Sequence, residues 1–142
     1  MKIIRISTDS EMSVHEFPEG TYREQNEELR RLIGPQCELF EHVLPKRLYS
    51  ELGVPGKVLR EAGGFVSMLI DEEGIFNDLD ENPIGSYLYE TDKHGHPIAG
   101  NILLVGEKLS SEGVDFCGIS DKRFGLLYTQ LKEMIEKERA FA

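Results

Sequence analysis

A short apolar run near the middle of the chain, residues 65–70, ends abruptly at the sequence Asp-Glu-Glu-Gly. An apolar run of this length between turn signals is typical of a buried central strand, because a buried helix would extend further. A second apolar run covers residues 98–105 and follows the turn-forming sequence Lys-His-Gly-His-Pro. We therefore predict a sheet whose core contains these two segments, with Gly106 ending the second one.

Three further segments show the alternation of polar and apolar residues that is typical of strands. Residues 2–7 and 12–17 alternate on either side of Thr8-Asp9-Ser10, which predicts a β-hairpin. Residues 37–44 mix apolar and acidic residues in alternation before Pro45, which predicts a further strand. Together with the two apolar runs, these segments predict a single sheet of about five strands, largely antiparallel or mixed.

Two segments have the signatures of substantial helices. Thr21 and Glu24 form a capping box, and the helix that they start is expected to end at Gly34-Pro35. From Ser120 onward, apolar residues follow helical spacing nearly to the C-terminus. Shorter helices are expected at residues 46–52 and after Asn82-Pro83.

The pattern as a whole predicts an α+β fold in which two main helices pack on the sheet. A length of 142 residues fits one globular domain, residues 1–142. The periodicities predict a buried core that comprises Ile4, Ile6, Leu32, Met68, Ile70, Leu103, Val105, Leu127 and Leu131.

The charge of the chain disfavours direct nucleic-acid binding. Asp and Glu number 26 against 16 Lys and Arg, a net charge of −10 that opposes the approach of a phosphate backbone. Residues 71–92 carry no Lys or Arg and eight acids: Asp71, Glu72, Glu73, Asp78, Asp80, Glu81, Glu90 and Asp92. This segment fits a solvated surface, a docking surface for a partner, or a mimic of a polyanion.

The sequence has no feature of an exported, membrane-bound or disulfide-linked protein. No apolar run approaches the ~20 residues of a membrane helix, and the N-terminus has the pattern of a strand rather than of a signal peptide. Cys37 and Cys117 lie far apart and in no CxxC pair, which favours reduced, buried thiols. We expect a cytoplasmic protein without membrane association.

Motifs for metal binding or catalysis are weak. His94 and His96 could reach one metal ion, but structural sites use four ligands in a recognisable spacing. The acidic residues from Asp71 to Asp80 lack the glycine position of a calcium loop. The sequence contains no nucleophile elbow, phosphate-binding loop or dinucleotide fingerprint. We expect no metal, no cofactor and a function in binding, with an enzyme of unrecognised type as an alternative.

Several segments of the chain resemble a known family: residues 2–6, 37–49, 68–74, 82–89, 98–106 and 115–119. On these segments, which extend over most of the chain, the sequence resembles domain of unknown function family 3846, small proteins of phages and conjugative elements. The resemblance implies accessory work for a mobile genetic element, such as countering host defence. It implies no activity, cofactor or catalytic residue.

These observations favour a small acidic protein that binds a protein or a small ligand. Two alternatives differ in mechanism. In a DNA-mimic antirestriction protein, the acidic segment would imitate a row of phosphates. In a sponge for a signalling nucleotide, basic and aromatic residues of the segment 46–60 would line a pocket.

Binding contacts are expected from two segments of opposite charge, 46–60 and 71–92, because recognition residues concentrate on loops held by a rigid scaffold. Such a pair of segments can dock on a partner with the complementary pattern or on a second copy of the chain in a homodimer. The candidate binding residues are Lys46, Arg47, Tyr49, Lys57, Arg60, Asp71, Glu72, Glu73, Asp78, Asp80 and Glu81.

Overall fold

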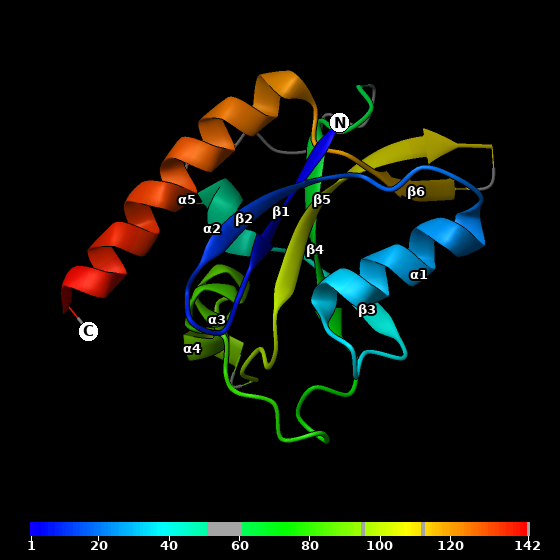
Figure 1. Cartoon of the computed structure of the whole chain (residues 1–142). Helices are drawn as coiled ribbons and strands as arrows, with labels where there is room; N and C mark the ends of the chain where they lie inside the picture. Colours follow the sequence, from blue (N-terminus) through cyan, green and yellow to red (C-terminus); the bar gives the residue numbers. More distant parts are fainter. Residues whose placement is uncertain (51–60, 95, 112, 142) are drawn as a thin grey trace.

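The computed structural model describes residues 1–50, 61–94, 96–111 and 113–141. It confirms the α+β class (Figure 1). The strands are β1 (Lys2–Ile6), β2 (Met12–Glu16), β3 (Phe40–Val43), β4 (Phe65–Asp71), β5 (Ile102–Ser110) and β6 (Gly113–Cys117). The helices are α1 (Tyr22–Ile33), α2 (Lys46–Ser50), α3 (Pro83–Tyr89), α4 (Thr91–His94) and α5 (Asp121–Phe141).

The strands form one antiparallel sheet in the order β2-β1-β5-β4-β3. Strand β6 pairs with the C-terminal half of β5, from Gly106 to Ser110. The two apolar runs lie at its centre, since β4 pairs with β5 from Phe65 opposite Glu107 to Leu69 opposite Leu103. All residues of β4 are buried. The prediction of a buried central strand at residues 65–70 is therefore confirmed.

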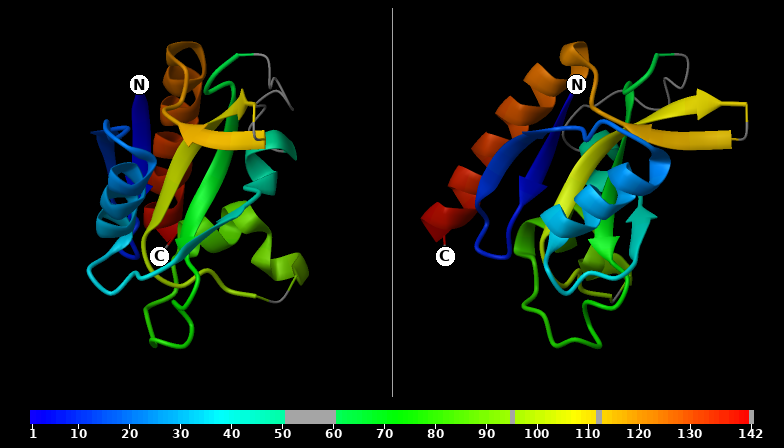
Figure 2. Two further views of the ribbon diagram at one scale, coloured as in Figure 1. Left: turned by 90° about the vertical axis from the view of Figure 1, so that its right-hand side faces the viewer. Right: turned by 45° about the vertical axis from the view of Figure 1, so that its right-hand side comes forward.

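Helices cover both faces of the sheet, so that the molecule has three layers (Figure 2). Alternate residues of each strand point to opposite faces. On one face, Leu29 and Ile33 of α1 pack against β1, β4 and β5. On the other face, helices α2, α3 and α5 pack on the sheet and contribute Leu48, Ile84, Leu88, Leu127, Leu131 and Ile135 to a larger cluster. The two predicted main helices, α1 and α5, thus lie on opposite faces.

The predicted core is largely confirmed: all of its members are buried except Leu32, which is half-buried beside the α1 cluster. The capping box at the start of α1 is also present. The backbone N–H of Glu24 donates to Thr21 Oγ1 at 3.2 Å, and the N–H of Thr21 donates to Glu24 Oε1 at 3.0 Å. The helix ends as predicted, with the N–H of Gly34 bonded to the Arg30 carbonyl.

The prediction was wrong about the last strand, which begins at Ile102 and continues through Gly106 to Ser110 before turning into β6. Gly106 permits a close approach of two backbones rather than ending the strand. A Cβ at this position would lie 2.3 Å from the Gly118 carbonyl oxygen. The predicted strand at residues 37–44 is also shorter, since β3 begins only at Phe40 and Cys37 is instead buried under α1.

The longest helix, α5, carries mostly charged residues on its outer face. Lys122, Lys132, Glu133, Glu136 and Lys137 are exposed, while Leu127 and Leu131 are buried against the sheet. Among the described residues, no helix combines the length and the apolar character that crossing a membrane requires.

Candidate functional site

Residues 72–81, which we call the acidic loop, connect β4 to α3 and extend away from one end of the sheet (Figure 1). Five predicted site residues lie in it, and all are exposed: Glu72, Glu73, Asp78, Asp80 and Glu81. None of their carboxylates forms an ion pair or hydrogen bond with another side chain in the described part of the chain. Their negative charge is therefore directed to solvent.

Backbone hydrogen bonds hold the acidic loop in one conformation. The N–H of Gly74 donates to the Asp71 carbonyl at 3.2 Å, and the N–H of Leu79 donates to the Gly74 carbonyl at 3.1 Å. At the far end of the loop, the N–H of Gly100 donates to the Asp80 carbonyl at 2.8 Å. The loop is thus attached both to the end of β4 and to the segment that precedes β5.

Asp71, a predicted binding residue, serves this framework instead of facing solvent. It ends β4 and is only 4% exposed. Its carboxylate accepts hydrogen bonds from the N–H of Glu73 at 2.9 Å and from Gln36 Nε2 at 3.2 Å. Asp71 therefore positions the acidic loop.

Two apolar side chains are exposed within the acidic loop. Phe76 is 89% exposed and Ile75 is 57% exposed. A single exposed apolar residue is ordinary on a protein surface, but an aromatic ring this exposed on a loop held by hydrogen bonds has the character of an interface anchor. The acidic loop thus presents an apolar tip among carboxylates.

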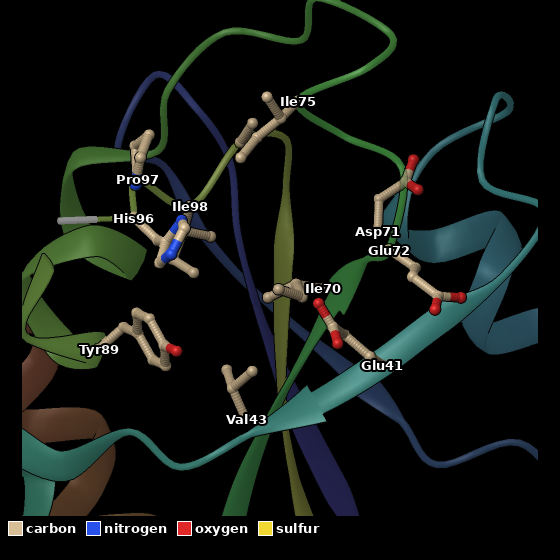
Figure 3. A pocket seen from close by; sticks show the side chains of 11 residues that line it. Glu41, Val43, Ile70, Asp71, Glu72, Ile75, Tyr89, His96, Pro97 and Ile98 are labelled. Atoms are coloured by element: carbon tan, nitrogen blue, oxygen red, sulfur yellow. The ribbon is translucent and has the colours of Figure 1, made fainter. Parts of the chain in front are cut away.

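A pocket of about 260 Å³ lies between the acidic loop, β3, β4 and the segment that follows α4. Its apolar lining includes Val43, Ile70, Ile75 and Ile98. In Figure 3, the carboxylate of Glu41 points into the pocket, and Tyr89 and His96 stand on the opposite wall. Glu72 also lines the pocket, but its carboxylate points away.

Arg47, one of the predicted basic binding residues, is used by the fold. Arg47 is 7% exposed and donates hydrogen bonds to the Tyr87 carbonyl at 3.0 Å and to Asp92 Oδ2 at 2.8 Å. Its guanidinium also lies over the Tyr87 ring, 4.4 Å from the centroid. Arg47 therefore joins α2 to α3 and α4 (Figure 1). Lys46 is half-buried, and Lys57 and Arg60 lie outside the described residues.

Tyr49 completes the hydrogen bonding of β4 where β3 no longer pairs with it. Its hydroxyl accepts a hydrogen bond from the N–H of Val66 at 2.9 Å and donates one to the Val66 carbonyl. The ring stacks on Phe65 with centroids 5.2 Å apart. Burial raises the pKa of the phenol to about 12. These contacts direct Tyr49 into the fold.

The two cysteines are buried, and the described residues contain no cluster suited to a metal ion. In the part of the chain that the structure describes, no group of three or more His, Cys, Asp or Glu side chains is placed to hold a metal ion. Cys37 and Cys117 are free and buried, as the sequence predicts. Burial, with a smaller contribution from the charge of Asp71, raises the pKa of the Cys37 thiol to about 11. A thiol with a raised pKa is a poor nucleophile near neutral pH.

The structure brings together residues that the sequence did not connect. Glu41, Tyr89 and His96 come from separate segments and meet only through the fold. The exposed ring of Phe76 had a visible signal: the apolar pair Ile75-Phe76 interrupts a run of acidic residues. Comparisons of the chain with family models, curated proteins and solved structures found no match.

Proposed function

We propose that this chain is a binding protein that recognises a protein partner through its acidic loop. The partner surface would contain an apolar depression surrounded by Lys and Arg. One observation carries the proposal: Phe76, at 89% exposure, is presented by a loop with five unpaired carboxylates within the described residues.

The loop is suited to rigid recognition because its conformation is fixed before binding. Hydrogen bonds at Gly74, Leu79 and Gly100 hold its two ends. Binding through a preformed loop avoids much of the entropy cost of ordering a flexible segment. A buried aromatic ring at the centre of an interface is among the side chains that contribute most to binding energy.

The negative charge of the loop favours a partner surface whose rim is positively charged. Glu73, Asp78 and Asp80 are exposed near the apolar tip, and the loop contains no Lys or Arg. Complementary positive charge on the partner would accelerate association and favour the correct orientation. Screening by salt would slow that association.

Two alternatives receive less support from the structure. A nucleotide sponge would need free cations and aromatics, but Arg47 and Tyr49 already bond to the chain itself. A DNA mimic would present carboxylates in place of phosphates, and Phe76 has no counterpart in a phosphate backbone. Recognition of a protein uses both the charge and the ring. The resemblance to proteins of mobile elements supports an accessory role in which the partner belongs to the host.

Site-specific photo-crosslinking tests the proposal. A photoreactive phenylalanine analogue would replace Phe76 in one variant and Leu126, which is 45% exposed on α5, in the control. In cells that carry the gene, we expect position 76 to crosslink to one protein at a peptide rich in Lys and Arg, and position 126 not to do so. Equal labelling from both positions, or crosslinking of position 76 only to another copy of the chain, would contradict the proposal.

A further inference from the structure

We infer that the pocket beside the acidic loop binds an aliphatic chain that ends in a cation, such as a lysine or arginine side chain or a free alkyl amine. The inference rests on the lining of the pocket, which combines apolar walls with carboxylates. The size, the charge and the rigidity of the pocket each narrow the class of ligand.

The apolar part of the lining fits the aliphatic stem of such a ligand. Ile70 and Ile98 form part of the wall and belong to the main core cluster, so their positions are fixed by packing. A volume of about 260 Å³ lies just below the range of typical ligand sites, about 300 to 1,000 Å³. The pocket therefore suits one side chain or a small amine and is small for a nucleotide.

The polar part of the lining favours a positive charge. Among the described residues, the lining includes Glu41, Asp71 and Glu72 but no Lys or Arg. Asp71 is already bonded to Gln36 and to the Glu73 backbone, and Glu72 points away (Figure 3). Glu41 is therefore the carboxylate that meets the bound cation, with Tyr89 and His96 on the facing wall (Figure 3). An anionic ligand would be repelled.

The pocket is preformed because each wall is attached to its neighbour. Thr91 Oγ1 donates a hydrogen bond to the His96 carbonyl at 2.6 Å, which fixes the segment that carries His96. Glu81 pairs with Ala99 in an isolated β-bridge, which fixes the far end of the acidic loop. A preformed site loses little conformational entropy on binding.

The cation could come from two sources with the same chemistry. The pocket adjoins the acidic loop, so a basic residue at the rim of the proposed partner surface would reach it. That source rests on the proposed function. A free alkyl amine is the other source and needs no protein partner.

NMR titration of the purified chain tests the inference. The probes are N-acetyl-lysine methylamide and its uncharged analogue N-acetyl-norleucine methylamide, and the readout is the methyl shifts of Ile70 and Ile98. We expect the lysine probe to shift these methyl signals saturably. The norleucine probe should bind with an affinity at least about fivefold lower because it lacks the charge. Absence of saturable shifts, or equal binding of the two probes, would overturn the inference.

Substitutions identify which carboxylate binds the cation and whether the cation comes from a protein partner or from a free amine. Glu41→Gln should weaken binding of the lysine probe by at least about fivefold, whereas Glu133→Gln, at an exposed position on α5 outside the pocket lining, and Phe76→Ala should leave its affinity unchanged. Equal effects of the two glutamine variants would overturn the assignment of Glu41. If the partner supplies the cation, Glu41→Gln weakens partner binding by a similar factor; if it does not, the source is a free amine. Failure of the probe titration leaves crosslinking at position 76 intact, so the two proposals fail separately.

Discussion

The carbonyl oxygen of Ala99 lies directly against Gly74: a Cβ at Gly74 would lie only 2.7 Å from that oxygen. This close approach places the start of the acidic loop directly against the segment that leads into β5. The bridge between Glu81 and Ala99 holds the far end of the loop against the same segment, and the hydrogen bond from the Gly74 N–H to the Asp71 carbonyl joins the start of the loop to β4. The exposed ring of Phe76 is therefore carried by a loop whose two ends both lie against the segment that leads into β5.

Gly74→Ala should destabilise the fold because the added methyl group meets a backbone oxygen that cannot move without displacing the loop. We expect a loss of about 1 to 3 kcal/mol in the free energy of unfolding, measured by urea denaturation. Gly125→Ala in α5 is the control, since a Cβ there would meet no atom within 4 Å beyond its chain neighbours and the backbone of its own helix. Alanine is the better helix former, so the control should be neutral or stabilising by up to about 1 kcal/mol. Equal stability of the two variants would contradict the contact.

Asn82→Asp should be strongly destabilising at neutral pH. The Asn82 side chain is fully buried and donates to the carbonyls of Ile6 and Gly100, both at 3.0 Å, while its oxygen accepts from the N–H of Gly85 at 2.9 Å. A carboxylate would face two carbonyl oxygens, and we expect a loss of at least about 3 kcal/mol.

The loss caused by Asn82→Asp should shrink on acidification. The two carbonyls raise the pKa of the introduced carboxyl in the folded chain above its pKa in the unfolded chain, which is near 4. The variant therefore loses folding stability as the pH rises above about 4. Thermal unfolding at pH 4 and pH 7 measures the difference. The control, Asn77→Asp, changes an exposed side chain and should shift stability by less than about 0.5 kcal/mol at either pH. A pH-independent loss would exclude the charge as its cause.

Tyr49→Phe should expose the role of the phenol at the edge of β4. The substitution leaves both backbone polar groups of Val66 without the hydroxyl that they bond to now. We expect a loss of about 1 to 3 kcal/mol in unfolding free energy by urea denaturation. Tyr22→Phe, at a side chain 72% exposed, should have no measurable effect. An unchanged unfolding free energy for Tyr49→Phe would contradict the hydrogen bonds between the Tyr49 hydroxyl and the Val66 backbone.

The buried thiol of Cys37 should make the fold sensitive to alkaline pH. Its pKa is raised from an ordinary value of 9.0 to about 11 in the folded chain. Between these values the unfolded chain releases the proton and the folded chain keeps it, so stability is retained below pH 9 and lost as pH rises through 11. Comparison with Cys37→Ala isolates this contribution, since the stability of the wild type should fall more steeply over that interval. Parallel pH profiles for the two proteins would contradict the raised pKa.

The sequence predicts those parts of the fold that depend on local signals. The apolar run at residues 65–70, the Thr21 capping box and the Asn82 helix start all carry their information within a few neighbouring residues. Gly106 misled the prediction because its conformation is ordinary, and the reason for a glycine there is the distant Gly118 backbone. Without that contact, a glycine at the end of an apolar run is typical of a strand end.

The candidate site was predictable only in part. The charge of the acidic loop is visible in the sequence, but the burial of Asp71 and Arg47 depends on partners elsewhere in the chain. Glu41 and His96 meet through the order of strands in the sheet, which no local pattern encodes. Sequence patterns therefore identified the loop and missed the pocket beside it.

The most direct test of the proposed function is a binding measurement. The crosslinked partner is purified, and its affinity for the wild type is compared with its affinity for Phe76→Ala. Isothermal titration calorimetry at low and at physiological salt measures it, with Leu126→Ala as the control for loss of an exposed apolar side chain. If Phe76 anchors the interface, Phe76→Ala should weaken binding by about 30-fold or more, as expected for the loss of a central anchor, with no change for Leu126→Ala. Affinities within twofold of each other for all three proteins would contradict recognition through the acidic loop.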